Sequence, residues 1–405
     1  MRRMMRLTIL ALLAVLLAGW VRPAGGPAEP TAVPTARAEA REDVVVLFAT
    51  NVGKGDALIL RAGNYACLID AGKAWAMGRV KAALASMGVA RLDGVFLTHT
   101  DDDHAGGLEW LAAGDIPVDN WYAPAMYTGV KEKKHPATLA AGARGQEVQW
   151  LRRGDAIPLG DSGAVLRVLA PASLFEDKDD NNSLVMLLES AQGRMLLTGD
   201  MELPEEAELM AQGDDLACAV LKVPNHGDDD TTSREFAQAV SAQVAVISTD
   251  SQEKPGTPDP GVVERLMAAG SQVVVTQDAD LGLRVTLRGS AAAVESVDIE
   301  AAPVSGISIT RVDPSDDIVV LENTSAAAID LGGFYLHSSR GDELFPFPEG
   351  ASIAPGGALT VGTNSTDGDF DLLWDDKKVI HKSKSDTVTL YDGWGRAVDA
   401  ASNGL

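Results

Sequence analysis

Short apolar runs separated by polar turns and helical stretches fill the chain from Asp43 to about Leu287. Apolar residues spaced three or four apart predict helices at 74–87 and 204–211, and the apolar runs predict buried strands. The predicted strands read VVVLFATNVG, DALILRAG, YACLIDAG, DGVFLTHT, RVLAP, SLVMLLES, RMLLTGD, LACAVLKVPNH, VAVIST, QVVVTQDAD and LGLRVTL. Several of them end on His or Asp, which is typical of a layered α/β domain with its functional site at the strand ends.

The pattern changes after about Ala302. The predicted strands there are ISITRVDP, DIVVLENTS, FYLHSS, ALTVGTN, DTVTLYD and GRAVDA. They are broken by Gly, Pro, Asn and Asp, and helical spacing is absent, which predicts an all-β sandwich. Residues 303–306 form a short linker that favours close packing of the two units. We therefore divide the chain into a leader at 1–40, an α/β domain at 41–302 and a β-sandwich at 303–405.

The first residues are typical of a targeting segment. Three arginines, Arg2, Arg3 and Arg6, precede an apolar run from Leu7 to Val21, and small residues follow it. The run is shorter than the roughly 20 residues that a membrane-spanning helix needs. This order predicts a secretory signal cleaved after Ala38 or Ala40, and an uncleaved anchor is the alternative. Either way we expect a secreted or extracytoplasmic protein with at most one membrane anchor.

Charge and cysteine content narrow the function classes. The 405 residues contain 58 Asp and Glu against 34 Lys and Arg, a net charge of −24. A chain this acidic does not coat polyanions, so any contact with nucleic acid is local or metal-assisted. Cys67 and Cys218 cannot make a disulfide scaffold, and we expect two buried free thiols in strands. His135 lies in the charged segment KEKKHP and is expected to be solvated.

The strongest chemical signal is the hexapeptide His99-Thr100-Asp101-Asp102-Asp103-His104, directly after an apolar strand. Imidazoles and carboxylates at alternating positions of one turn can converge on divalent cations. Asp200 and His226 each stand at the end of a later predicted strand. Together with the histidines and aspartates of the hexapeptide, these two residues predict a metal site.

These motifs resemble the metallo-β-lactamase superfamily, and more closely the hydrolase domain of ComEC competence proteins. That domain carries an opening similar to VGQGDA, here Val52 to Ala57, and an Asp at the third motif position, as Asp101 does. Further matches are LIDAG at 68–72, NNSLV at 181–185, LLTGD at 196–200 and VPNHG at 223–227. The likeness runs from about Asp43 to Leu287.

The resemblance implies an αββα sandwich that holds one or two divalent metal ions, with metal-bound hydroxide as the nucleophile. It implies that His99 and Asp101 hold a first metal, that Asp103, His104 and His226 hold a second, and that Asp200 bridges them. The catalytic set it implies is Asp103, Asp200 and Ser183. Asp56 and Asp70 would orient the ligands from behind. Asp101 in place of a His favours Mn²⁺ or Mg²⁺, with Zn²⁺ as an alternative.

Asn182, Asn225 and Thr257 are the residues expected to face the substrate. Two of them depart from the family pattern, because Asn225 and Thr257 each stand where the family carries His. We expect an exported metal-dependent hydrolase, a phosphodiesterase or nuclease acting on DNA or nucleotides. The departures leave open an alternative of another class, a cell-envelope binding or scaffold protein whose hydrolase domain is weak.

The segment Ile307 to Val398 resembles the lamin-tail domain, an immunoglobulin-like sandwich. The matching stretches are VVLEN, IDLGGF, FPFP, IAPGG and DTVTLYD. Such a module binds or positions more often than it catalyses. The partner of this domain is not predicted by the sequence, and a nucleic acid or nucleotide remains the expected substrate of the chain.

Overall fold

The computed structural model describes residues 44–376 and 378–405. The predicted leader at 1–40 lies outside these residues, so the predicted signal or anchor stays a prediction. Among the described helices, none has both the length and the apolar character needed to cross a bilayer.

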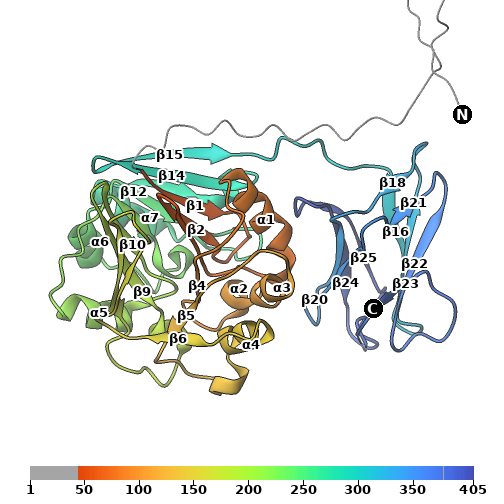
Figure 1. The fold of residues 1–405 in the computed structure, drawn as a ribbon, viewed down its shortest axis with the longest axis horizontal. Coiled ribbons are helices and arrows are strands. Elements are labelled where there is room, and N and C mark those ends of the chain that lie inside the picture. The colour runs from red at the N-terminus through yellow and green to blue at the C-terminus, as the bar shows by residue number, and fades with distance from the viewer. Residues whose placement is uncertain (1–43, 377) are drawn as a thin grey trace, which may run out of the picture. The chain divides into compact units, whose positions relative to one another are not determined.

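The α/β domain is built on two facing sheets (Figure 1). The first has eight strands in the order β15-β14-β1-β2-β3-β4-β5-β6, and the second has seven in the order β13-β12-β11-β10-β9-β8-β7. The strands of the first are Ala291–Val297, Gly282–Arg288, Val45–Thr50, Leu58–Ala62, Tyr65–Ile69, Gly94–Phe96, Trp121–Pro124 and Val148–Leu151. Those of the second are Gln272–Val275, Val244–Ile247, Val220–Lys222, Gly193–Leu197, Val185–Ser190, Val165–Ala170 and Ala156–Pro158.

Helices cover the outer face of each sheet. They are α1 (Met77–Ser86), α2 (Asp102–Ala105), α3 (Leu108–Ala113), α4 (Pro136–Ala143), α5 (Leu203–Ala211), α6 (Arg234–Val240) and α7 (Pro260–Ala268). Figure 1 shows α1, α2 and α3 on one side of the paired sheets and α5 and α6 on the other. One apolar cluster fills the space between the two sheets. A second lies between the first sheet and its helices, and a third lies between the second sheet and its helices. The domain is therefore an αββα sandwich, as the sequence predicts.

Short 3-10 turns connect these elements near the strand ends. They are η1 (Ala74–Ala76), η2 (Glu132–Lys134), η3 (Asp179–Asn182), η4 (Pro224–Gly227) and η5 (Thr276–Asp278). Two of them, η3 and η4, contain residues of the candidate site.

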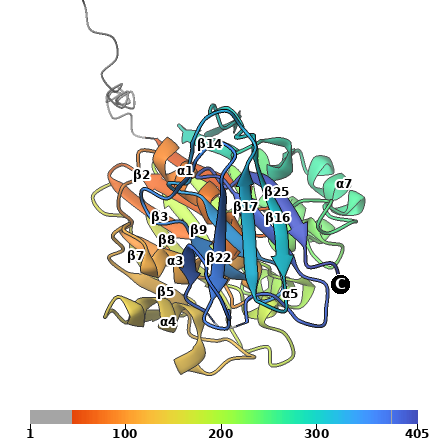
Figure 2. The same ribbon diagram turned by 90° about the vertical axis from the view of Figure 1, so that its right-hand side faces the viewer.

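The C-terminal segment is an all-β sandwich, whose strands β16, β17 and β22 are seen side by side in Figure 2. One sheet has the order β16-β17-β22-β23 and another β20-β19-β24-β25, with a small sheet of β18 and β21. In chain order, β16 to β25 span Ile307–Asp313, Ile318–Asn323, Ile329–Asp330, Tyr335–Ser338, Glu343–Pro346, Ser352–Ile353, Ala358–Thr363, Leu372–Trp374, Thr387–Tyr391 and Ala397–Ser402. A separate apolar cluster forms their core.

The two domains contact each other at η1 and at the end of the α/β domain. The hydroxyl of Tyr335 donates to the carbonyl of Trp75 at 2.6 Å, and the ring of Trp75 stacks on Tyr391 with centroids 5.6 Å apart. Arg396 donates to the carbonyl of Ile299 at 2.6 Å. The close packing expected from the short linker is thus observed.

Two expectations about single residues have different outcomes. Cys67 and Cys218 are both free, as predicted, but only Cys67 is buried in a strand, β3, whereas Cys218 is half-buried and lies just before β11. Burial raises the pKa of each thiol, that of Cys218 to about 12. The prediction that His135 is solvated is wrong, because its side chain is fully buried between Tyr127 and Trp150.

Candidate metal centre

The loop after β4 carries four of the predicted ligands in one turn. β4 ends at Phe96, and α2 begins at Asp102. The backbone N–H groups of His104 and Ala105 donate to the carbonyl of Asp101, at 3.0 and 2.8 Å, which closes the turn. His99 and His104 are both fully buried, so the turn directs its imidazoles into the protein.

The carboxylate of Asp70 hydrogen-bonds this loop and fixes its position. Asp70 follows β3 with a left-handed φ of 57°. Its carboxylate accepts hydrogen bonds from the N–H and the hydroxyl of Thr98, both at 2.7 Å, and from Nδ1 of His104 at 2.7 Å. Because Nδ1 of His104 donates to a carboxylate, the ring is oriented with its Nε2 toward the interior of the site.

Asp200 and His226 come from the second sheet. They follow β10 and β11, which are neighbouring parallel strands whose carboxyl ends share one edge. Asn225 and His226 have left-handed φ values of 39° and 54° within η4. Nδ1 of His226 donates to the carbonyl of Ser248 at 2.7 Å, which directs its Nε2 toward the donor cluster as well.

Four donors converge where the two loops meet. The Nε2 atoms of His104 and His226 lie 3.2 Å apart. Asp200 places Oδ1 3.2 Å from Nε2 of His104 and Oδ2 3.0 Å from Nε2 of His226, and Asp103 Oδ2 lies 3.5 Å from the latter. Ligands bound at about 2.0–2.2 Å around one divalent ion lie at such separations from each other. These four side chains fit a metal ion.

A second group of donors includes a residue that the sequence reasoning missed. His99, Asp101 and Asp180 bring one ligand atom each within 4.8 Å of one another. Nε2 of His99 is buried and has no hydrogen-bond partner among the described residues, while its Nδ1 lies 3.1 Å from the hydroxyl of Thr98. Asp180 belongs to η3, and its position just before the NNSLV match is the signal that could have identified it.

Asp200 lies between the two groups of donors. Its Oδ2 is 3.0 Å from Nε2 of His226 and 3.9 Å from Nε2 of His99. A carboxylate with two oxygens can serve ions on both sides. The position is the one expected of a bridging ligand.

The buried imidazoles and carboxylates of the site shift each other's pKa values. Burial disfavours the charged form of His104, but Asp200 and Asp70 outweigh it and raise the pKa of His104 well above its usual value. Burial likewise opposes ionisation of Asp200, yet His104 and His226 hold its pKa well below the usual range. Asp200 therefore interacts electrostatically with both imidazoles of the donor cluster.

Asp56 lies behind the metal loop, as expected, and it is paired with a cation that the sequence reasoning did not use. Its Oδ2 lies 4.0 Å from Nδ1 of His104 and 2.5 Å from Nζ of Lys222. Both members of this ion pair are buried. The backbone N–H of Asp56 donates to the carbonyl of Asp103 at 3.1 Å, so the pair lies directly behind the donors.

Ser183 and Asn182 are placed near the site, but their side chains are bonded within the protein. The hydroxyl of Ser183 accepts a hydrogen bond from the N–H of Asp200 at 2.9 Å. The amide of Asn182 bonds both the N–H and the carbonyl of Phe175. Both side chains are fully buried, which favours a positioning role over the expected contact with substrate.

Asn225 and Thr257 are likewise turned to protein partners. The amide nitrogen of Asn225 lies 3.4 Å from Glu202 and 3.3 Å from Asp230. The hydroxyl of Thr257 lies 2.8 Å from that of Thr249 and is buried. Neither residue belongs to the donor groups described above, so the two departures leave those groups intact.

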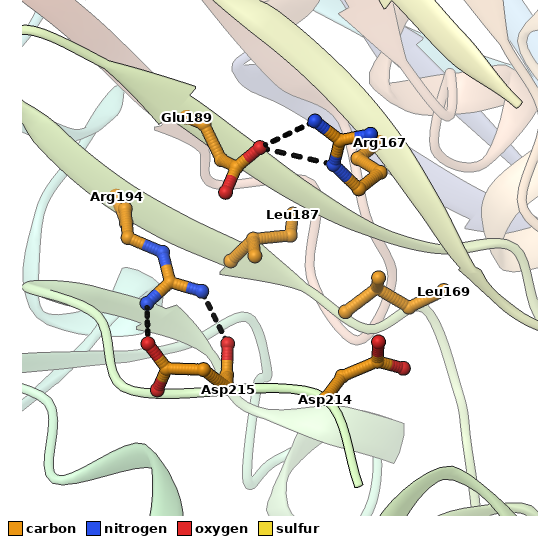
Figure 3. A pocket seen from close by; sticks show the side chains of 7 residues that line it. All are labelled: Arg167, Leu169, Leu187, Glu189, Arg194, Asp214 and Asp215. Carbon is orange, nitrogen blue, oxygen red and sulfur yellow. Dashed lines mark hydrogen bonds and ion pairs between the residues drawn. The ribbon is translucent and has the colours of Figure 1, made fainter. Parts of the chain in front are cut away.

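A surface hollow of about 340 Å³ lies elsewhere, against strands β8, β9 and β10 (Figure 3). Ion pairs line it: Arg167 pairs with Glu189 at 3.0 Å, and Arg194 with Asp215 at 2.7 Å. None of the predicted ligands lines this hollow. Its basic side chains are already neutralised by acidic partners, so it does not compete with the strand ends as the functional site.

Comparison with known proteins agrees with the two-domain architecture. The model of the metallo-beta-lactamase superfamily matches residues 50–251, and that of the lamin tail domain matches residues 300–404. ComE operon protein 3 of Bacillus subtilis is 31% identical over 48% of this chain and 24% of its own length. Competence protein ComA of Neisseria gonorrhoeae is 29% identical over 65% of this chain and 33% of its own length. The chain thus spans a third or less of these relatives.

Among solved structures, the metallo-beta-lactamase fold protein YhfI from Bacillus subtilis aligns with 60% of this chain and 100% of its own, at 13% identity and a TM-score of 0.40.

Proposed function

We propose that this chain, in which a metallo-β-lactamase superfamily domain is followed by a lamin tail domain, is a divalent-metal-dependent hydrolase of phosphodiester bonds in nucleic acids or nucleotides. One observation carries the proposal. The Nε2 atoms of His104 and His226 lie 3.2 Å apart, with oxygens of Asp103 and Asp200 beside them. Two imidazole nitrogens and two carboxylates gathered at these separations form a donor set typical of a divalent-metal site.

The donor groups divide between two ions. Asp103, His104, Asp200 and His226 would hold one ion, and His99, Asp101 and Asp180, with the second oxygen of Asp200, would hold the other. Carboxylate-rich sets of this kind suit Mn²⁺ or Mg²⁺, while the three imidazoles also suit Zn²⁺. When bound, such ions lower the pKa of water and neutralise charge on an attacked phosphate.

The chain's own residues orient the donors. The carboxylate of Asp70 and the carbonyl of Ser248 bond the Nδ1 atoms of His104 and His226, which orients both imidazoles with Nε2 toward the donor cluster. The N–H of Asp200 is fixed by Ser183. These hydrogen bonds come from elements in both sheets, and they preorganise the site.

The surroundings of the site support an anionic substrate. Although the chain carries a net charge of −24, lysines gather at this edge. Lys54 Nζ lies 2.5 Å from Asp103, and Lys178 Nζ lies 2.8 Å from Asp180. A lysine ammonium beside a metal ligand can give its remaining N–H donors to a phosphate oxygen. The resemblance to the hydrolase domain of competence proteins motivates the choice of a nucleic acid or nucleotide as the source of this phosphate.

Metal content and hydrolysis test the proposal together. The purified chain is loaded with Mn²⁺, Mg²⁺ or Zn²⁺, dialysed, and its metal content is measured by elemental analysis. Hydrolysis of bis-para-nitrophenyl phosphate and of single- and double-stranded DNA is then measured. We expect one to two ions per chain and phosphodiester cleavage with at least one of them.

His381→Gln serves as the control variant, since His381 lies in the C-terminal domain and its Nδ1 accepts a hydrogen bond from the N–H of Ser383. It is expected to keep metal and activity. A chain that folds but retains no metal would contradict the proposal and favour the alternative of a binding or scaffold protein. Retained metal without phosphodiester cleavage would contradict the substrate class alone.

The location of the protein is a further part of the proposal. A signal at 1–40 would place the hydrolase outside the cytoplasm. There the lamin tail domain would bind a partner or position the hydrolase domain. Sequencing the N-terminus of the protein recovered from the envelope and the medium tests this. An intact N-terminus in the cytoplasmic fraction would contradict export.

A further inference from the structure

We propose that the ammonium group of Lys54 is the side chain that contacts the phosphate of the substrate at the open side of the metal centre. The inference rests on the proposed function and deepens it. It assigns a substrate-binding role to Lys54, a residue of the opening motif that is not one of the proposed metal ligands.

The position of Lys54 is fixed by the backbone around it. Lys54 stands in the loop between β1 and β2, with a glycine on each side. A side-chain Cβ at Gly55 would come 2.4 Å from the carbonyl oxygen of Asp103, and one at Gly53 would come 2.4 Å from the carboxylate of Glu253. The N–H of Lys54 also donates to Glu253 at 3.1 Å. The loop is therefore packed tightly against the metal loop.

Lys54 lies on an exposed side of the donor cluster. The side chains of His104, His226 and Asp200 are 0%, 0% and 4% exposed, whereas those of Asp103 and Lys54 are 14% and 22% exposed. Exposure thus rises from the donor cluster toward Lys54. A phosphate held at the ions enters from this direction.

The ammonium group has hydrogen bonds left to give. Among the described residues its side-chain partner is Asp103 Oδ2 at 2.5 Å, and a lysine ammonium has three N–H donors. By contrast, Lys222 is fully buried against Asp56, and Lys178 already bonds two carboxylates, those of Asp180 and Glu202. Lys54 is the cation best placed to add a charge-assisted bond to a phosphate oxygen.

The position also distinguishes this chain from the motif it resembles. The competence-protein opening reads VGQGDA, with Gln where this chain has Lys54. A Gln side chain is neutral and one atom shorter, so it cannot supply the same contact. The substitution Lys54→Gln therefore removes the proposed interaction while it keeps a side chain that the motif accommodates.

The test separates substrate contact from metal binding. Parent, Lys54→Gln and Lys54→Arg proteins are loaded with Mn²⁺, and their metal content is measured after dialysis. The affinity for inorganic phosphate is measured by calorimetry, and kcat and KM are measured on bis-para-nitrophenyl phosphate. We expect equal metal content, and a loss of about tenfold in phosphate affinity and in kcat/KM for Lys54→Gln. Lys54→Arg should restore most of both.

Lys254→Gln is the matched control, because it also removes one lysine charge near the site. Lys254 pairs with Asp228 at 3.2 Å and bonds none of the donors. Removing the Lys254 charge should change phosphate affinity by no more than about twofold, because solvent and salt screen the interactions of exposed charges. An equal loss in Lys254→Gln and Lys54→Gln would overturn the contact in favour of a general field effect.

Three other results are decisive. A loss of metal in Lys54→Gln would show that Lys54 acts on Asp103, and would overturn the inference. Unchanged phosphate affinity in Lys54→Gln, with the parent binding phosphate, would overturn the inference but leave the proposed function intact. A parent that holds metal but neither binds phosphate nor cleaves phosphodiesters would contradict the proposed function itself.

Discussion

His104 and His226 face each other through their Nε2 atoms at 3.2 Å, and each has its Nδ1 bonded to an acceptor on its own side of the site. The two residues are 122 positions apart in the sequence and come from different sheets. The loops after β4 and β11 therefore supply one half each of a single donor set. An ion bound by this pair would therefore link the packing of the two sheets to metal binding.

Replacing His226 with Ala should remove the ion that joins the two sheets. We expect one metal ion fewer per chain and a loss of hydrolysis of about a hundredfold or more. A ligand present at a hundred times its dissociation constant stabilises the folded state by about 2.7 kcal/mol, so the variant should also lose most of the protection against urea that added metal gives the parent. Elemental analysis and urea unfolding with and without Mn²⁺ measure both effects. Unchanged metal content would rule out His226 as a ligand.

Asp180 offers a test of the other donor group. Asp180→Asn keeps the shape of the side chain but weakens a carboxylate ligand beside His99 and Asp101. We expect weaker retention of one ion while the ion near His226 stays bound. The control is Asp177→Asn, which removes an exposed charge from the same segment. Metal titrations of the two variants that coincide would show that Asp180 is not a ligand.

The sequence predicts the parts of the site that lie in one contiguous motif or directly after a strand. His99 and His104 stand in a single turn, and Asp200 and His226 each follow an apolar run. The pattern places each of them at the end of a strand, and the resemblance to the metallo-β-lactamase superfamily implies that they converge. Asp180 was missed because it is one of 58 acidic residues, and it comes near His99 only through the packing of η3.

Local composition is a poor guide where a short segment changes direction. The lysines before His135 predict a solvated side chain. In the structure, η2 ends at Lys134, His135 adopts an extended backbone with φ of −63° and ψ of 131°, and Pro136 begins α4. That change of direction turns His135 inward, between Tyr127 and Trp150. The long-range aromatic contacts that bury it are not visible in the local pattern.

The buried ion pair between Lys222 and Asp56 should be costly to break from one side. Lys222→Met leaves Asp56 without its cation in a site that excludes water, and an uncompensated buried charge costs about 3–5 kcal/mol. The double variant Lys222→Met with Asp56→Asn should be more stable than Lys222→Met alone, because it removes the orphaned charge. Urea unfolding of the metal-free proteins measures the difference. A double variant that is less stable than Lys222→Met would contradict this account.

His135 should make the folded state sensitive to acid. Burial lowers its pKa to about 4, with Asp179 opposing the shift, whereas an unfolded chain has a His pKa of about 6.5. Between these values the unfolded chain binds more protons than the folded one, so the free energy of unfolding falls as the pH drops through this window. Above about pH 6.5 the two states bind equally and the contribution of His135 is constant.

His135→Phe keeps a ring between Tyr127 and Trp150 and removes this titration. We expect the variant to gain stability relative to the parent as the pH falls from about 6.5 to about 4, with no such trend above that window. Urea unfolding of both proteins at a series of pH values, in the presence of a chelator, measures the difference. Tyr127→Phe is the control, because it alters the same cluster without removing the imidazole. Parallel pH profiles for parent and His135→Phe would show that His135 takes up its proton equally well in the folded state.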